Sequence, residues 1–253
     1  MANSSFRFGI LGTANIARKN WRGIHESGNS IVAAVASRDM ERSREFIRAC
    51  QSEVPFPTAP QAYGSYEELL ASNAVDAVYI PLPTGLRKEW VLKAARAGKH
   101  IVCEKPCAVT VSDLREMLDA CREHKVQFLD GVMFMHSLRL EAMRAVLEDK
   151  QSVGQIRHMT SAFSFHAPPE FFTSNIRARG EMEPHGCVGD LGWYCIRLSL
   201  WAMAWQTPRE VSGRMLNQFQ APGGSIAVPF TGSSHLSSNS GFDLVRVGID
   251  YTF

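Results

Sequence analysis

The sequence predicts an α/β protein: an N-terminal doubly wound parallel sheet followed by a second domain of α+β structure. Apolar runs of strand length alternate with helix-length segments from residue 6 to about residue 130. This order requires crossover connections, and such connections join parallel strands. Beyond residue 133 the alternation stops, and a β-rich run, an apolar helix and a Gly/Ser-rich stretch follow. We therefore expect domains at 1–132 and 133–253.

Each element of the first domain is bounded by residues that start or stop it. Asp39, Ser65 and Ser112 are placed to cap helices at their N-termini, and Gly98 is placed to end one. The proline-interrupted segment 51–62 is expected to be a loop. The expected strands are 6–11, 30–37, 75–81, 100–103 and 127–133, and the expected helices are 14–25, 39–50, 66–71, 86–97 and 113–123.

The second domain has a different order of elements. Its C-terminal part, from residue 221, is rich in Gly and Ser before a last strand-like run. The apolar composition of its second helix predicts burial. The expected helices are 137–149 and 187–204, and the expected strands are 155–165, 209–219 and 243–253.

Composition excludes several classes of protein. Lys and Arg number 27 and Asp and Glu 25, a net charge of +2, which is too balanced for an electrostatic nucleic-acid binder. No apolar run approaches the roughly 18 residues of a membrane span, and no signal-peptide pattern opens the chain. The six cysteines lack zinc-ligand spacing, so we expect no metal site and reduced thiols in a cytoplasmic protein.

A variant of the dinucleotide fingerprint follows the first expected strand. Residues 12–17 read G-x-A-x-x-A, with Gly12 for the tight turn, Ala14 for close approach to a pyrophosphate and Ala17 for helix–strand packing. The helix N-terminus would supply N–H groups to the phosphates. An ordinary strand–helix turn is the alternative. The expected cofactor contacts here are Gly12, Thr13, Ala14, Asn15 and Ile16.

The tip of the second expected strand favours NADP over NAD. An NAD site places Asp or Glu there for the ribose 2′-hydroxyl, whereas this chain has Ser37 and Arg38. A hydroxyl and a guanidinium suit a 2′-phosphate better. The alternative is that Asp39 only caps a helix and Arg38 is a solvated surface residue. NAD is the second choice.

Residues 97–106 read A-G-K-H-I-V-C-E-K-P. Together with the fingerprint, this segment resembles the Gfo/Idh/MocA oxidoreductases, in the branch of glucose-fructose oxidoreductase and dihydrodiol dehydrogenase. The resemblance implies a Rossmann domain followed by a domain with an open mixed sheet. It also implies that Lys105 lies near the nicotinamide and the substrate, that Glu104 holds the cofactor ribose, and that the Lys105–Pro106 bond is cis. A surface lysine before a turn proline is the alternative.

Residues 190–194 read D-L-G-W-Y and resemble the D-x-G-x-Y at the start of a substrate-domain helix in the same branch. By this resemblance Tyr194 is the general acid/base, because a phenol can donate a proton to a developing alkoxide. Asp190 is expected on the same helix face, where it would anchor a substrate hydroxyl or Lys105. A core tyrosine beside a capping aspartate is the alternative.

Two segments depart from the family pattern. The family has Pro-Asn-x-x-His after a crossover strand, and residues 83–87 read P-T-G-L-R. The turn before residue 190 has fewer consecutive glycines than usual. By analogy, the cofactor also contacts Pro81, Leu82, Pro83, Thr84 and Arg87, and the substrate contacts Arg177 and His185.

The resulting expectation is an NADP-dependent oxidoreductase acting on CH-OH or CH-CH groups of a sugar, polyol or dihydrodiol. Since family members continue further, we expect a C-terminally truncated substrate and dimerisation domain with an incomplete sheet. The partners expected are a small-molecule substrate and a second copy in a homodimer, with no nucleic acid and no membrane. The alternative is a catalytically impaired NADP-binding sensor or interaction protein of the same fold.

Overall fold

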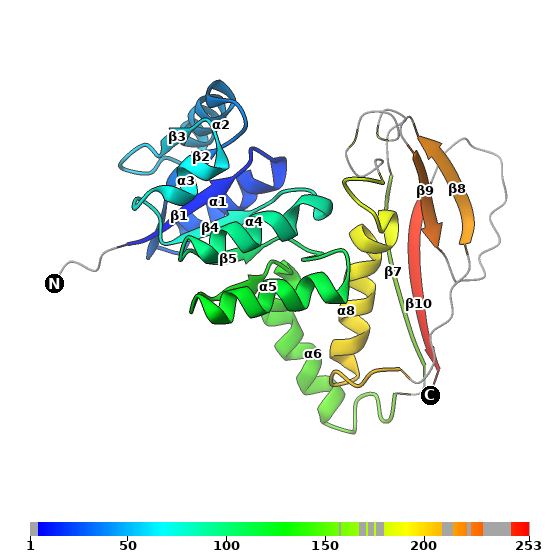
Figure 1. Ribbon diagram of the computed structural model, residues 1–253. Helices are drawn as coiled ribbons and strands as arrows, with labels where there is room; N and C mark the ends of the chain where they lie inside the picture. Colours follow the sequence, from blue (N-terminus) through cyan, green and yellow to red (C-terminus); the bar gives the residue numbers. More distant parts are fainter. Residues whose placement is uncertain are drawn as a thin grey trace. The chain divides into compact units, whose positions relative to one another are not determined.

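The computed structural model describes residues 5–156, 158–166, 171, 175, 180–208, 215–221, 224–229 and 244–252 (Figure 1). The chain divides into two compact units, Met1–Gly131 and Val132–Phe253, and each is described by itself.

The N-terminal unit is built on a parallel sheet with strand order β3-β2-β1-β4-β5-β6. The order reverses between β1 and β4, as in doubly wound sheets. The strands are β1 (Phe6–Leu11), β2 (Ser30–Ala36), β3 (Gln61–Tyr63), β4 (Ala77–Ile80), β5 (His100–Cys103) and β6 (Phe128–Asp130). The helices are α1 (Asn15–Glu26), α2 (Met40–Glu53), α3 (Tyr66–Ala71), α4 (Thr84–Arg96) and α5 (Val111–Glu123).

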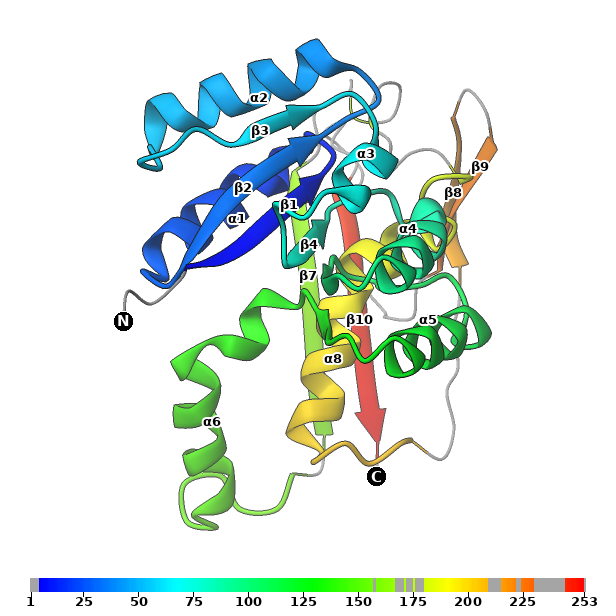
Figure 2. The same ribbon diagram turned by 60° about the vertical axis from the view of Figure 1, so that its left-hand side comes forward.

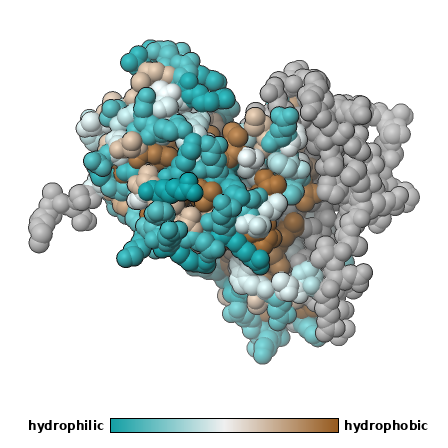
Figure 3. Space-filling view, viewed as in Figure 1, coloured by the Kyte–Doolittle hydropathy of each residue, from teal (hydrophilic) through white to brown (hydrophobic). Residues whose placement is uncertain are grey.

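Helices cover both faces of this sheet, so the central strands β2 and β4 are largely buried and mostly apolar, whereas the edge strands β3 and β6 are not buried. On one face Trp21 of α1 and Phe46 of α2 pack on β1 and β2. On the other face Leu69 of α3, Val91 of α4 and Met117 of α5 form a second core. Figure 2 shows α3, α4 and α5 on the side of this unit away from α1 and α2. The predicted doubly wound architecture is therefore confirmed. The surface of this unit that is seen in Figure 3 is mainly hydrophilic.

Local side-chain bonds set the helix starts. The Asp39 carboxylate accepts from the Glu41 amide at 2.9 Å, and the Ser65 hydroxyl accepts from the Glu68 amide at 3.2 Å, as predicted. The predicted cap Ser112 is wrong, because the Thr110 hydroxyl accepts from the Asp113 amide at 3.0 Å and α5 begins at Val111. The expected loop 51–62 is also wrong at its end, because Gln61 and Ala62 belong to β3, which pairs with β2.

The second unit contains an antiparallel pair formed by β7 and β10 and another formed by β8 and β9. The expected helix 187–204 begins instead as a π turn and becomes α-helical only at Trp193. Strand β9 lies in the Gly/Ser-rich stretch, where no strand was expected. The elements are η1 (Met133–His136), α6 (Leu138–Glu148), β7 (His158–His166), η3 (Val188–Gly192), α8 (Trp193–Ala202), β8 (Met215–Ala221), β9 (Gly224–Pro229) and β10 (Leu244–Thr252).

Candidate active site

Two helix N-termini lie at the point where the strand order of the N-terminal sheet reverses. Helix α1 follows β1 and helix α4 follows β4, and β1 and β4 are neighbours. Their cap residues are Ala14 and Pro83, and within the described residues no side chain caps either helix. Helices α2, α3 and α5 are all capped by side chains. In doubly wound sheets, ligands bind in the crevice at such a reversal, where uncapped N–H groups can bind an anion.

Gly12 makes the turn between β1 and α1. Its φ is +110°, and a Cβ added there would lie 3.2 Å from the Leu82 side chain and 3.6 Å from the Tyr66 hydroxyl. Its amide donates to the Ala36 carbonyl at 2.8 Å. A side chain at residue 12 would strain the backbone and crowd the turn, so the glycine keeps the approach to the α1 N-terminus open.

The other expected contacts on this turn are half-buried or exposed. Thr13, Ala14 and Ile16 are half-buried, and Asn15 is exposed. Asn15 and Ile16 are the first residues of α1, Ala14 is its N-cap, and the first turn contains no acidic side chain. The local environment therefore suits a phosphate.

At the tip of β2, Ser37 and Arg38 have different environments. The Ser37 hydroxyl donates to the Asp39 carbonyl at 2.6 Å and accepts from the Asp39 amide at 3.1 Å. Ser37 is buried, whereas Arg38 is exposed. The two bonds of Ser37 thus fix the turn that contains Arg38. Asp39 caps α2, as the alternative interpretation of this segment expected.

A second arginine, Arg42 in the first turn of α2, was missed in the sequence analysis. Burial raises the pKa of Tyr66, and the charges of Arg38 and Arg42 act in the opposite direction. The Tyr66 hydroxyl lies beside Gly12, so both arginines contribute positive potential at this turn. Arg38 precedes the N-cap Asp39 and Arg42 is the third residue of α2, so the two arginines flank the start of this helix.

Glu104 and Lys105 follow β5, the strand next to β4. The Glu104 amide donates to the Ile80 carbonyl at 3.2 Å, which fixes this turn against the end of β4. One Glu104 carboxylate oxygen accepts from the Tyr79 hydroxyl at 2.7 Å, and the other accepts from the Lys105 amide at 3.2 Å. The Lys105–Pro106 bond is cis, which confirms that prediction. Both Glu104 and Lys105 are half-buried.

Arg87 is only 5% exposed and joins two loops. Its Nε donates to the Leu82 carbonyl at 2.7 Å, and its Nη1 donates to the Thr84 hydroxyl at 3.1 Å and to the Pro106 carbonyl. These bonds fix the loop after β4 to the turn after β5. A direct contact of Arg87 with the cofactor stays a prediction. Pro81, Leu82 and Thr84 are buried and Pro83 is half-buried in the same segment.

Apart from Lys105, the residues expected to act on the substrate belong to the second unit. Tyr194 is half-buried, and its ring lies 5.2 Å from the Phe163 ring and 5.9 Å from the Phe134 ring. Asp190 stands in the π turn, and such turns often occur at functional sites. Burial, and secondly the charge of Asp190, raise the pKa of Cys187 to about 12. His185 is exposed, and Arg177 lies outside the described residues.

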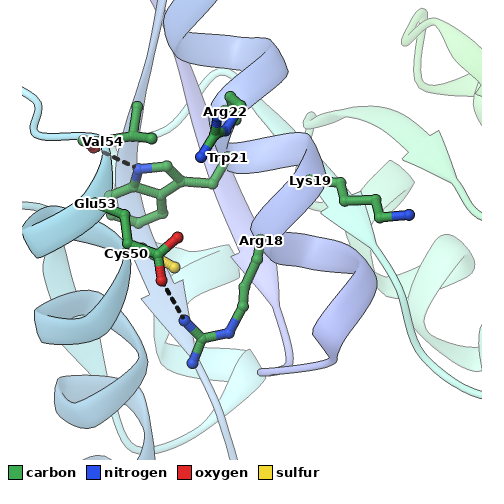
Figure 4. A pocket seen from close by; sticks show the side chains of 7 residues that line it. All are labelled: Arg18, Lys19, Trp21, Arg22, Cys50, Glu53 and Val54. Atoms are coloured by element: carbon green, nitrogen blue, oxygen red, sulfur yellow. Dashed lines mark hydrogen bonds and ion pairs between the residues drawn. The ribbon is translucent and has the colours of Figure 1, made fainter.

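A separate pocket of about 310 Å³ lies between α1 and the end of α2 (Figure 4). In it the Arg18 side chain reaches toward Glu53, 3.8 Å away, and the Trp21 indole donates to the Val54 carbonyl. Its lining residues are Arg18, Lys19, Trp21, Arg22, Cys50, Glu53 and Val54. They include none of the expected site residues.

Among the residues that the structure describes, no group of three or more His, Cys, Asp or Glu side chains could hold a metal ion. None of the described helices has the length and apolar character to cross a membrane. All six cysteines are buried and outside any disulfide.

Two family descriptions match the chain. "Oxidoreductase family, NAD-binding Rossmann fold" (GFO_IDH_MocA) matches residues 6–132, and "GFO/IDH/MocA C-terminal domain" (GFO_IDH_MocA_C3) matches residues 140–242.

Curated relatives are similar over most of this chain and about half of their own length. D-xylose 1-dehydrogenase (NADP(+)) 2 of Haloferax volcanii is 37% identical over 190 residues, 75% of this chain and 54% of the relative. Trans-1,2-dihydrobenzene-1,2-diol dehydrogenase of Bos taurus is 32% identical over 181 residues, 72% of this chain and 50% of the relative. The chain thus spans about half the length of the curated relatives that it matches.

Solved structures share the fold. A 3-ketoreductase from Actinomadura kijaniata in complex with NADP and TDP-benzene superposes with a TM-score of 0.69 at 28% identity, over 79% of this chain and 57% of that one. GenD2 from gentamicin A biosynthesis, in complex with NAD, superposes with a TM-score of 0.75 at 16% identity, over 88% of this chain and 60% of that one.

Proposed function

Since this chain belongs to the Gfo/Idh/MocA family of oxidoreductases, we propose that it is an NADP-dependent oxidoreductase acting on a CH-OH or carbonyl carbon of a sugar, polyol or dihydrodiol. The observation that carries the proposal is the pair of uncapped helix N-termini at the strand-order reversal, with Glu104 and Lys105 on the neighbouring strand end.

The residues present fit a dinucleotide. Gly12 has a positive φ, and a Cβ there would lie 3.2 Å from Leu82, so glycine fits this turn without crowding. The turn leads into the N-terminus of α1, which no side chain caps. Arg38 and Arg42 carry positive charge near the same turn. Two guanidinium groups would bind the 2′-phosphate that distinguishes NADP from NAD. The N–H groups of α4, after Pro83, would bind a second polar part of the cofactor.

Each proposed catalytic residue has a role set by its chemistry. When bound, the cofactor supplies or accepts the hydride. Tyr194 would give a proton to the substrate oxygen or take it back, Lys105 would stabilise negative charge on that oxygen, and Asp190 would orient a substrate hydroxyl. Glu104 would accept hydrogen bonds from the cofactor ribose. Arg177 and His185 stay proposed substrate contacts.

Substrate class, location and assembly are parts of the same proposal. Two relatives, a D-xylose dehydrogenase and a dihydrodiol dehydrogenase, are named for substrates with adjacent hydroxyl groups, which supports such a substrate for this chain. The six cysteines outside disulfides suit the reducing cytoplasm. We also keep the homodimer as the expected assembly.

The proposal is tested in two steps on the full chain. NADPH and NADH are titrated by fluorescence, and the protein is then assayed with a panel of sugars, polyols and dihydrodiols. We expect tighter binding of NADPH and turnover of at least one compound, with turnover strongly reduced in Lys105→Met. Binding of NADPH without any turnover would support the sensor alternative, and no binding of either cofactor would overturn both interpretations.

A further inference from the structure

We propose that Tyr79 and Asn20, neither of which was expected at the site, are positioning residues that orient the Glu104 carboxylate toward the cofactor ribose. This inference rests on the proposed function, because it assigns the carboxylate a ribose to bind. It concerns only residues of the N-terminal unit, whose mutual geometry the structure gives.

The three side chains form a continuous chain of hydrogen bonds from α1 to the end of β5. The Asn20 amide nitrogen lies 2.8 Å from the Tyr79 hydroxyl oxygen, and that hydroxyl lies 2.7 Å from a Glu104 carboxylate oxygen. Tyr79 is 2% exposed and packs in the core between the sheet and helices α1 and α2. Its ring therefore has a fixed place from which the hydroxyl reaches Glu104.

The direction of each bond follows from the chemistry of its partners. The Asn20 nitrogen is also 3.4 Å from the Ile16 carbonyl oxygen, and a carbonyl can only accept. The nitrogen is thus the donor, and the Tyr79 oxygen accepts from it. The single phenol proton must then point to Glu104, which as a carboxylate can only accept.

The carboxylate is held at both oxygens. One accepts from Tyr79 and the other from the Lys105 amide, so its plane is fixed by two bonds. A carboxylate has about four acceptor positions, and these two bonds leave capacity on both oxygens. Two acceptors in one fixed plane match the adjacent hydroxyls of a ribose. Burial, and then the charge of Glu104, raise the pKa of Tyr79, so the phenol stays a donor at neutral pH.

The decisive variant is Tyr79→Phe, which keeps the ring and removes only the hydroxyl. We expect NADPH to bind about 3- to 10-fold more weakly, the usual worth of one hydrogen bond. The matched control is Tyr63→Phe, since the Tyr63 hydroxyl donates to Ser72 at 2.9 Å in the same unit and makes no contact with Glu104. The control should bind NADPH like the parent chain. Thermal unfolding of both variants shows whether either has lost stability.

A double-mutant cycle separates positioning from a general structural effect. If Tyr79 acts through Glu104, then Tyr79→Phe should change NADPH affinity by less than 2-fold in a Glu104→Ala background. Equal weakening in both backgrounds, or unchanged NADPH affinity in the single variant, would overturn the inference. Failure of the parent chain to bind NADPH would instead overturn the proposed function, and the inference with it.

A second variant keeps the test sound if Tyr79→Phe folds poorly. Asn20→Asp replaces the donor by a carboxylate, which competes with Glu104 for the phenol proton. We expect NADPH affinity to fall at least 3-fold, and to fall much less when Glu104 is already alanine. Parent-like affinity in Asn20→Asp would contradict the proposed hydrogen-bond chain.

Discussion

The Arg87 guanidinium donates a hydrogen bond to the carbonyl oxygen of Pro106, so the helix that follows β4 is joined to the turn that follows β5. Arginine has five donors, and Arg87 uses three of them on Leu82, Thr84 and Pro106. Arg87 therefore connects the two loops that carry the candidate cofactor site.

Removing this connection should destabilise the protein. Arg87→Met fills much of the same volume but leaves the buried carbonyls of Leu82 and Pro106 without their donor. We expect the free energy of unfolding in urea to fall by about 2–4 kcal/mol, from two or more lost buried hydrogen bonds. The control is Arg96→Met in the same helix, where the side chain is exposed. That variant should stay within about 0.5 kcal/mol of the parent, and an equal loss in both would contradict the assigned role of Arg87.

The choice of cofactor should depend on Arg38 and Arg42 together. We expect Arg38→Asp to weaken NADPH binding by at least 10-fold and to leave NADH binding nearly unchanged, because only NADPH carries the 2′-phosphate. Arg42→Gln should weaken NADPH binding by a smaller factor in the same direction. Fluorescence titration with both cofactors measures each effect. Arg44→Gln, in the same helix but paired with Glu41 at 3.6 Å, is the control. Equal affinities for both cofactors in the parent would contradict the preference.

The fold of the N-terminal unit could largely be predicted because its central strands are buried on both faces. Their apolar runs stand out from the helical segments between them. Strand β3 was missed because it has only three residues, at the sheet edge, after a proline-rich segment. Similarly, Thr110 and Ser112 are both good caps in the sequence, and only the backbone path of the turn decides between them.

The site could be predicted only where a motif has a fixed local geometry. The fingerprint turn and the Glu104–Lys105–Pro106 segment belong to that class. The roles of Tyr79 and Arg87 could not be predicted, because Glu104 is 25 residues from Tyr79 and Pro106 is 19 residues from Arg87 in the chain. Neither a buried tyrosine nor an arginine on a helix reveals from the sequence which carbonyl or carboxylate it will meet.

Acid should weaken one specific stabilising contact, the ion pair between Arg7 and Asp76. The Arg7 side chain donates to both Asp76 carboxylate oxygens, at 2.6 and 3.1 Å, and this contact holds the pKa of Asp76 below its usual range. Because the folded-state pKa is lowered, the contribution is fully present above the unfolded pKa of about 3.9 and is lost as the pH falls through the folded value. Asp76→Asn should therefore be less stable to urea than the parent at pH 7, with the difference shrinking below about pH 4.

The control for that prediction is Asp119→Asn. Asp119 pairs with Arg122 at 2.6 Å, but the Asp119 side chain is 70% exposed and the Arg122 side chain is 73% exposed. An exposed pair contributes little, so this variant should match the parent at both pH values. A stability difference for Asp76→Asn that is constant with pH would mean that the carboxylate charge is not what stabilises the contact.

Variants of Tyr194 and Phe134 can separate proton transfer from ring packing at Tyr194. Its ring contacts Phe134 and Phe163, and Tyr194→Phe keeps the ring while removing the hydroxyl. If the phenol is the general acid, turnover should fall by about 10²- to 10⁴-fold with NADPH affinity unchanged. Phe134→Leu is the opposite control, because it removes a ring contact and keeps the hydroxyl, and it should cost less than about 10-fold in turnover. Lys105→Met should slow turnover and shift its pH optimum. If Tyr194→Phe turns over at the parent's rate while Phe134→Leu is slow, Tyr194 is a packing residue, and the proton donor must be sought elsewhere.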